Sequence, residues 1–190
     1  MKRFIYLISP NKIDKNFYTN LKKVLSSKKV KYFQLRVKGK TNSYLITNSK
    51  KIKTITDKFK VKLIINDSPK VAKTVKAAGC HIGQSDASFI TAKKILKKRM
   101  VGVTCHGSNN LIDRAIKNKA DYIAIGSFFD SKLKPNAKKA NIRIIKETKK
   151  KTKIPIVAIG GINNKNYKKL ISLGANYIAI SSFIWNNPFL

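Results

Sequence analysis

Short apolar runs recur along the chain at similar intervals, and each is nearly continuous rather than alternating with polar residues. A continuous apolar run is typical of a strand that is buried on both faces of a parallel sheet. FIYLIS at 4–9 and IPIVAIG at 154–160 are examples. The pattern predicts eight strands, at residues 4–9, 32–36, 62–66, 80–83, 100–105, 122–127, 154–160 and 177–181.

Amphipathic segments separate the apolar runs and predict helices between the strands. Residues 14–28 place Phe17, Leu21 and Leu25 on one face, with lysines on the other. Asp14 is the first residue of this segment and is of the residue type that caps a helix N-terminus. We therefore expect a helix over 14–28 with Asp14 as its N-cap.

Two later segments carry start and stop signals for helices. Residues 69–78 open with Pro69, which suits a first helical turn, and are followed by Gly79, which suits a C-terminal cap. Residues 165–173 have helical spacing of their apolar positions and stop at Gly174. The chain thus alternates predicted strands with predicted helices throughout.

Eight β-α units in order predict an α/β fold, a (β/α)₈ TIM barrel, as a single domain over residues 1–190. The 190 residues leave about 24 per unit, which is short for this fold. About nine residues follow the last run, so we expect a final helix that is short or missing. A doubly wound open sheet is the alternative, but no GxGxxG follows the first run.

The composition is strongly basic, with 42 Lys and Arg against 8 Asp and Glu and a formal net charge of +34. A basic barrel that binds nucleic acid is therefore an alternative from another functional class. However, lysine is spread over the whole chain instead of being gathered in one tail or stripe. This distribution favours lysines that fill solvent-facing positions, and we expect no specific nucleic-acid partner.

Neither export nor membrane insertion is indicated. No apolar run approaches the roughly 18 residues of a membrane span, and the run after MKRF breaks at Pro10 with no cleavage site behind it. We expect a cytoplasmic protein without a membrane partner. Cys80 and Cys105 then read as buried reduced thiols, and their spacing is not that of a zinc site.

The few carboxylates include two at the ends of neighbouring predicted strands. Asp67 follows LIIN, and Asp86 follows the run that ends at 83. Adjacent barrel strands lie about 5 Å apart, so these carboxylates could bind one hard cation such as Mg²⁺. The alternative is local, with Asp67 in a turn or helix cap before Pro69 and Asp86 as the cap of the next helix.

Two sets of residues at the same strand ends suit anions. Arg36, Lys38 and Lys134 could hold a diphosphate together with Mg²⁺. Gly160-Gly161 and Ser181-Ser182 follow the last two strands, where barrels commonly bind phosphate. A tight turn with serines capping a short helix is the alternative for this second set. Two anion sites predict small phosphorylated substrates.

Taken together, these stretches resemble the thiamine-phosphate synthase family over nearly the whole chain. No single stretch is specific, but their order is. The family's strand-end motifs are similar to QLRVK (34–38), LIIND (63–67), HIGQSD (81–86), VGVTCH (101–106), GSFFDSKLKP (126–135), PIVAIGGI (155–162) and GANYIAISS (174–182).

The resemblance implies a transferase that joins 4-amino-2-methyl-5-(diphosphomethyl)pyrimidine to thiazole phosphate, giving thiamine phosphate and pyrophosphate by a dissociative mechanism. It implies Mg²⁺ held by Asp67 and Asp86. It assigns the pyrimidine diphosphate to Gln34, Arg36, Lys38, Asn66, Thr104 and Lys134. It assigns the thiazole phosphate to Ser131, Gly161, Ser181 and Ser182. Arg36, Lys38, Thr104 and Lys134 are the implied catalytic residues.

The chain departs from the family's pattern at a few positions. Val37 replaces a glutamate, Thr104 replaces a serine, and Leu133 replaces a threonine. Thiazole tautomerases share the barrel but need no diphosphate site, so a tautomerase-like paralogue is the second interpretation. The retained Asp67 and Asp86, with the amide and cations around them, favour the synthase. The sequence leaves a homodimer open.

Overall fold

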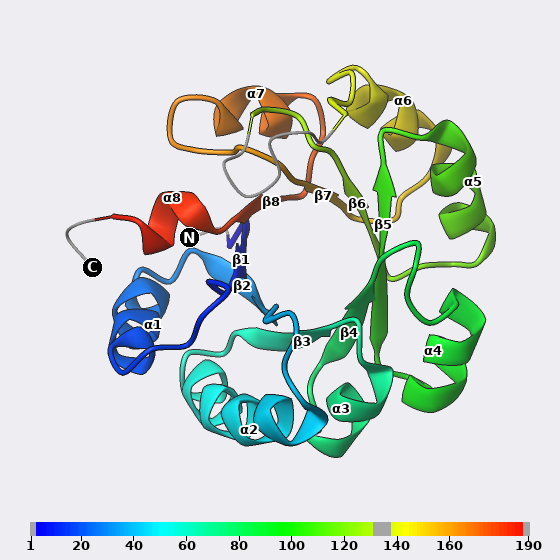
Figure 1. Cartoon of the computed structure of the whole chain (residues 1–190). Helices are drawn as coiled ribbons and strands as arrows, with labels where there is room; N and C mark the ends of the chain where they lie inside the picture. The colour runs from blue at the N-terminus through cyan, green and yellow to red at the C-terminus, as the bar shows by residue number, and fades with distance from the viewer. Residues whose placement is uncertain (1–2, 131–137, 188–190) are drawn as a thin grey trace.

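The eight strands form one closed, parallel barrel in which each strand pairs with its neighbours in chain order and β8 pairs with β1 (Figure 1). The computed structural model describes residues 3–130 and 138–187. The strands are β1 Ile5–Ile8, β2 Val30–Leu35, β3 Lys62–Asn66, β4 Gly79–Ile82, β5 Met100–His106, β6 Tyr122–Ile125, β7 Ile156–Ala158 and β8 Tyr177–Ile180. The predicted barrel is confirmed, and the alternative of an open doubly wound sheet is wrong.

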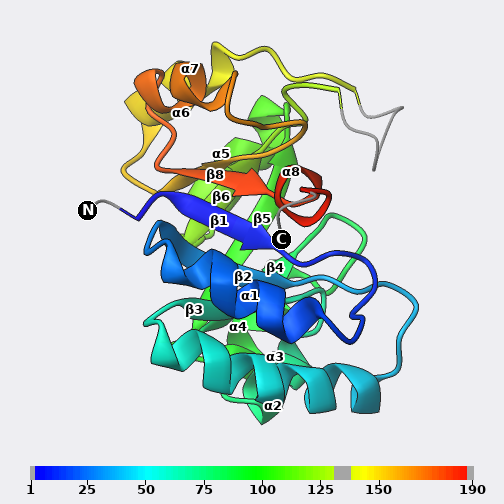
Figure 2. The same cartoon turned by 90° about the vertical axis from the view of Figure 1, so that its left-hand side faces the viewer.

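Helices surround the barrel, one after each strand (Figure 1). They are α1 Phe17–Ser26, α2 Asn42–Lys58, α3 Pro69–Thr74, α4 Phe89–Leu96, α5 Asn109–Lys117, α6 Ile144–Lys151, α7 Tyr167–Ser172 and α8 Ser182–Trp185. The expected short final helix is confirmed, since α8 has four residues. It lies beside the carboxyl ends of β1 and β8 (Figure 2), where Trp185 Nε1 donates to the Ile8 carbonyl at 2.6 Å.

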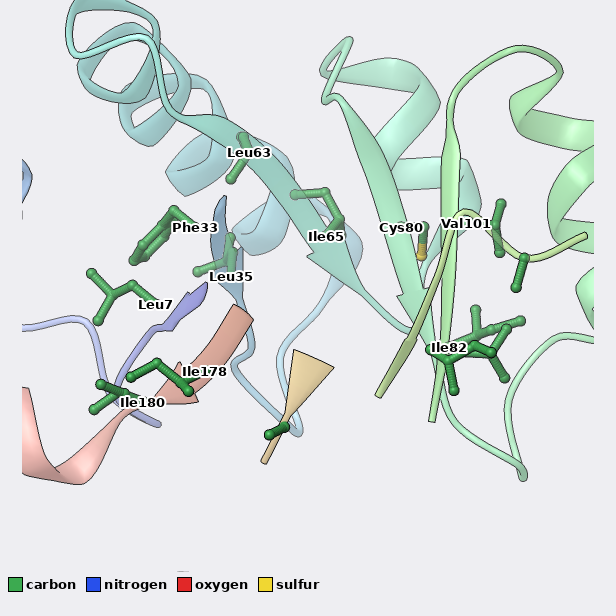
Figure 3. Close-up of a cluster of buried hydrophobic side chains, with 14 of the residues drawn as sticks. Leu7, Phe33, Leu35, Leu63, Ile65, Cys80, Ile82, Val101, Ile178 and Ile180 are labelled. Carbon is green, nitrogen blue, oxygen red and sulfur yellow. The ribbon is translucent and has the colours of Figure 1, made fainter. Parts of the chain in front are cut away.

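Strand residues alternate between two apolar layers. One face of each strand packs against the helices, in the layer drawn in Figure 3 with Leu7, Phe33 and Ile65 among its labelled members. The other face fills the barrel interior with Tyr6, Ile8, Tyr32, Ile64, Tyr122, Ala124, Val157 and Ala179. Both faces are thus buried, which explains why the strands appear in the sequence as continuous apolar runs.

Two predicted helix signals were wrong. Asn16, not Asp14, is the N-cap of α1, and Asp14 instead accepts a hydrogen bond from the Asn16 N–H at 2.9 Å in the turn before the helix. Gly79 does not cap α3, because it is already the first residue of β4. A Cβ on Gly79 would lie 2.3 Å from the Met100 carbonyl oxygen, so close strand packing is what requires glycine there.

Two other helix signals are confirmed. Pro69 lies in the first turn of α3, and Gly174 follows α7 with a φ of +109°. Elsewhere the turns from helix to strand use lysine in place of glycine. Five lysines have a φ between 53° and 58° just after a helix, namely Lys28, Lys60, Lys76, Lys97 and Lys119. Across the described residues, no helix has the length and apolarity to span a bilayer.

Candidate active site

A cavity of about 1140 Å³ opens at the carboxyl ends of the strands, and residues that follow all eight strands contribute to its walls. This is the end at which barrels present their βα loops and carry their chemistry. Its volume is large for a single small ligand, since pockets for one drug-sized molecule measure about 300–1,000 Å³. The cavity can therefore accommodate two small molecules side by side.

The fold brings together the site residues that the sequence predicted. Those that lie among the described residues all line this cavity, namely Gln34, Arg36, Lys38, Asn66, Asp67, Asp86, Thr104, Gly161, Ser181 and Ser182. Ser131 and Lys134, together with Leu133, lie outside the described residues. The assigned roles stay predictions, but the residues share one space.

Asp67 and Asp86 do not cap helices. Ser68 caps α3, with its side chain accepting the Val71 N–H, and Ser88 caps α4 in the same way through Thr91. The alternative of helix caps is therefore wrong for both aspartates. Asp67 has a φ of +60° directly after β3, and its N–H donates to the His81 carbonyl at 2.8 Å.

Asp86 is held by the tight HIGQSD loop. Its Oδ2 accepts the Gly83 N–H at 2.7 Å. A Cβ on residue 83 would lie 2.8 Å from the same oxygen, so glycine lets the carboxylate fold back over the loop. The loop thus turns this carboxylate toward the end of β3, where Asp67 lies.

The two carboxyl groups lie close enough to perturb each other. Burial raises the pKa of Asp67 to about 6, and a hydrogen bond and the charge of Asp86 act in the same direction. Lys38 and Arg36 oppose this rise in pKa through their positive charge. Two acids beside two cations in one half-buried space form a site with strong local fields of both signs.

Lys38 and Arg36 act on this pair from a distance, but within the described residues no salt bridge reaches it. The ion pairs found within the described residues use Asp57, Asp113, Asp121 and Asp130, and none involves Asp67 or Asp86. Asp130, the other acid on a loop at this end of the barrel, pairs with Lys139 at 2.9 Å. In a chain with 42 basic residues, two cavity carboxylates without a salt bridge are left free for another cation.

The donor set fits a hard divalent cation that is only partly coordinated by protein. Within the described residues, no three His, Cys, Asp or Glu side chains are grouped to hold a metal. Mg²⁺ commonly uses one or two carboxylates and takes its other oxygens from water and substrate phosphates. Asp67 and Asp86 match that arrangement, whereas a zinc site, which needs three or four protein ligands, does not fit.

A line of hydrogen bonds crosses the barrel interior beneath the carboxylates. Gln34 Nε2 donates to Tyr6 Oη at 2.9 Å, and Tyr6 Oη and Tyr122 Oη are 2.7 Å apart. His81 Nδ1 lies 3.0 Å from Tyr122 Oη, and His81 Nε2 lies 2.7 Å from Thr104 Oγ1. Burial lowers the pKa of His81 to about 4, so the ring is neutral near pH 7.

Sequence reasoning missed Tyr6 and Tyr122 as members of the site, and it placed His81 at a strand end without giving it a role. Tyr6 and Tyr122 stand inside continuous apolar runs, which do not reveal which residues face the barrel interior. Gly102 was the available signal, since a Cβ there would lie 1.9 Å from the Tyr122 ring. A glycine within a strand often marks such a close approach.

The opposite wall of the cavity is formed by the loops after β7 and β8. Gly160 and Gly161 have φ values of +102° and +62°, and a Cβ on either would lie within 2.2 Å of Ser127 or Asp130. The tight turn that needs glycine is therefore real, and it also lines the cavity. Ser181 does not cap α8 with its side chain; its Oγ donates to the Ser9 carbonyl at 3.2 Å.

Several sequence features fall outside the cavity. Val37 is buried in the layer between barrel and helices and does not line the cavity. Cys80 and Cys105 are free and buried, as predicted, and burial raises the pKa of both thiols, that of Cys105 to about 12.

The sequence matches the family described as thiamine monophosphate synthase over residues 5–184. The chain belongs to this family. It is 54% identical to the thiamine-phosphate synthase of Pelagibacter ubique (strain HTCC1062) over 187 residues, 98% of this chain and 90% of the relative. It is 36% identical to the thiamine-phosphate synthase of Erythrobacter litoralis, covering 96% and 88%. As a family member the chain is an enzyme, a transferase.

Solved structures agree with this family assignment. Thiamine phosphate pyrophosphorylase from Pyrococcus furiosus superposes with a TM-score of 0.85 at 26% identity, over 95% of this chain and 86% of that one. A 3-hexulose-6-phosphate synthase structure has a TM-score of 0.64 at 13% identity, over 97% and 93%, and shows the fold alone. The resemblance that the strand-end motifs indicated is thus confirmed.

Proposed function

We propose that this enzyme is a Mg²⁺-dependent thiamine-phosphate synthase. It joins 4-amino-2-methyl-5-(diphosphomethyl)pyrimidine to thiazole phosphate and releases pyrophosphate. The observation that carries the proposal is the juxtaposition of Asp67 and Asp86 with Arg36 and Lys38 in one cavity. This pairing of acids and cations suits a metal diphosphate, and the family's thiazole tautomerase branch has no use for it.

The reaction needs charge neutralisation more than acid-base chemistry. The carbon–oxygen bond breaks with its electron pair leaving on pyrophosphate, and the thiazole nitrogen then gives its lone pair to the pyrimidine methylene carbon. No proton has to be removed from that nitrogen, so no general base is required. Electrostatic stabilisation and positioning supply the rate, as in other transfers from a diphosphate.

Residues at different strand ends provide the electrostatic stabilisation and the positioning. Arg36 and Lys38, after β2, offset negative charge that develops on the departing pyrophosphate. Gln34 and Asn66, at the ends of β2 and β3, present amides to the pyrimidine half. Mg²⁺ held by Asp67 and Asp86 would supply further positive charge to the diphosphate.

The loops after β7 and β8 complete the site for the second substrate. Gly161, Ser181 and Ser182 line the wall opposite the carboxylates. Backbone N–H groups and hydroxyls of this kind bind phosphate in barrels. Holding the thiazole by its phosphate aims its nitrogen at the methylene carbon, which converts an encounter between two molecules into a reaction within one complex.

The test is product formation by the purified protein with both substrates, with and without Mg²⁺. We expect thiamine phosphate only with Mg²⁺, and a fall of about 10²–10³ in kcat for Asp67→Asn and for Asp86→Asn, the scale of losing one group that stabilises charge. Asp57→Asn is the matched control, because Asp57 pairs with Lys53 on α2 away from the cavity. A folded protein that forms no product at any Mg²⁺ concentration contradicts the proposal.

A further inference from the structure

We propose that Tyr6, Tyr122 and His81 form a buried relay that fixes the direction of the Thr104 hydroxyl. In that direction Thr104 donates its hydrogen to an anionic oxygen of the substrate diphosphate. The three residues are positioning residues that act through Thr104, and none of them needs to touch the substrate. This inference rests on the proposed function of the cavity.

The direction of the relay follows from counting donors and acceptors. Tyr6 Oη already accepts the Gln34 amide hydrogen at 2.9 Å. If Tyr122 also donated to Tyr6, the Tyr6 hydrogen would have no acceptor among the contacts in the described chain. A buried donor left without a partner destabilises the fold, because its hydrogen bond to water is lost and not replaced. Tyr6 therefore donates to Tyr122 across their 2.7 Å contact.

The same counting fixes the tautomer of His81. Tyr122 receives a hydrogen from Tyr6, and its own hydrogen needs an acceptor, which His81 Nδ1 provides at 3.0 Å. A neutral imidazole that accepts at Nδ1 carries its hydrogen on Nε2. His81 Nε2 therefore donates to Thr104 Oγ1 at 2.7 Å.

The Thr104 hydroxyl hydrogen is then directed away from His81. Thr104 lines the cavity that also contains Arg36 and Lys38, and within the described residues its Oγ1 has His81 as its one hydrogen-bond partner. In the opposite direction Thr104 would give its hydrogen to His81 and present only lone pairs to the cavity. Lone pairs repel an anion, so the relay decides whether Thr104 attracts or repels a diphosphate.

The relay is held rigidly in place by packing. The His81 and Tyr122 rings stack with an interplanar angle of 12° and centroids 5.6 Å apart. Tyr122 lies over Gly102, where any side chain would collide with its ring. Tyr6, Tyr122 and His81 are all buried. A donor fixed before the substrate arrives needs no reorganisation during the reaction.

Two substitutions of His81 distinguish loss of the hydrogen-bond donor to Thr104 from the mere replacement of the imidazole ring. In His81→Gln the amide nitrogen can reach the place of Nε2 and still donate to Thr104. In His81→Asn the amide nitrogen falls near the place of Nδ1, and the donor to Thr104 is lost. We expect His81→Gln to retain most of the wild-type kcat and His81→Asn to lose about tenfold with little change in KM, the scale of one hydrogen bond.

A double-variant cycle tests whether His81 acts through Thr104. Thr104→Val removes the hydroxyl, and Thr104→Ser is its conservative control. We expect His81→Asn to cause no further loss of kcat in the Thr104→Val background. Losses that multiply in the double variant would show that His81 only supports the fold, and they would overturn the relay.

The tautomer is measurable without any turnover. The chain has two histidines, so ¹⁵N spectra of the wild type, compared with a His106→Gln variant, identify the His81 ring. We expect hydrogen on Nε2 and none on Nδ1; the reverse overturns the inference. Wild-type protein that forms no thiamine phosphate would refute the proposed function, while this spectrum would still test the relay by itself.

Discussion

His81 lies on β4 and Asp67 directly follows the neighbouring strand β3, and burial favours the uncharged form of each. It lowers the pKa of His81 from 6.5 to about 4 and raises that of Asp67 from 3.8 to about 6. The two groups therefore have opposite effects on the stability of the fold near pH 7. A neutral histidine is the normal state near pH 7, whereas an ionised Asp67 is held there against its environment.

For His81 we predict a loss of stability in mild acid. The unfolded chain takes up a proton near pH 6.5 that the folded protein takes up only near pH 4, so stability falls as the pH falls from 6.5 to about 4. A difference of this size corresponds to about 3 kcal/mol. Urea unfolding at several pH values, with His81→Gln as comparison, isolates this contribution because all other titrating groups are shared. Parallel pH profiles for the two proteins would contradict it.

For Asp67, the proposed Mg²⁺ ligand, we predict that the ionised side chain destabilises the protein in the absence of metal. Its folded pKa lies above its unfolded value, so the stabilisation it provides when protonated is lost as the pH rises through about 6. Asp67→Asn removes that charge, and asparagine tolerates the φ of +60°. In Mg²⁺-free buffer at pH 7 we expect Tm to rise by about 2–4 °C. Asp57→Asn, which loses an exposed ion pair, should leave Tm nearly unchanged.

At the scale of the elements, the turns from helix to strand contain avoidable strain. The lysines with positive φ occupy positions where glycine is usual, and for an L-residue this backbone region costs about 1–2 kcal/mol. These turns lie at the opposite end of the barrel from the cavity. Their cations do suit the negative ends of helix dipoles, which offsets part of the strain.

Backbone strain at these lysines can be tested with a matched pair of glycine substitutions at helix α4. Lys97 follows the helix with φ 54° and ψ −113°, a conformation that favours glycine, whereas Lys94 lies within the helix and is exposed. We expect Lys97→Gly to stabilise the protein by about 1 kcal/mol and Lys94→Gly to destabilise it by roughly 0.5–1 kcal/mol. Thermal unfolding of both variants measures the sign of each change in stability. Equal destabilisation by both would refute the strain at Lys97.

At the scale of the whole molecule, charge is the unusual property. Helices α1 to α7 each carry lysine, so the positive charge surrounds the barrel and does not form one stripe. The ion pairs found within the described residues use four of the 42 Lys and Arg, and the net charge of +34 already counts every acid, so these pairs leave it unchanged. The expectation of no specific nucleic-acid partner stays a prediction from this distribution.

This charge predicts that salt stabilises the fold. Self-repulsion among the lysines is felt over about 30 Å at 0.01 M salt and over about 8 Å at 0.15 M. We therefore expect Tm to rise as NaCl is raised across this range, with most of the gain before about 0.15 M. Sucrose over the same range of osmolality serves as an uncharged control. A Tm that stays constant or falls with NaCl would exclude self-repulsion as a significant term.

The sequence by itself determined the barrel and the residues that follow the strands at the mouth of the cavity. Continuous apolar runs separated by amphipathic segments can bury both faces of every strand only in a sheet covered by helices. Because parallel strands present their carboxyl ends together, residues after the runs, such as Asp67, Asp86 and Arg36, had to meet. The family motifs follow the same strand ends, so resemblance and geometry selected the same residues.

Only the tertiary structure decided which side chains form the part of the site inside the barrel, and how they are hydrogen-bonded. Inward and outward residues of a strand buried on both faces are equally apolar in sequence, so Tyr6 and Tyr122 could not be told from core residues. The partners of His81 come from β5 and β6, 23 and 41 residues further along the chain, and a donor's direction depends on all of them together. The helix ends could not be predicted for a related reason. Gly79 is required by close strand packing and not by a helix cap, and the positive-φ positions after five helices are occupied by lysine in place of glycine. Contacts between segments distant in sequence, and not local propensity, fixed these features.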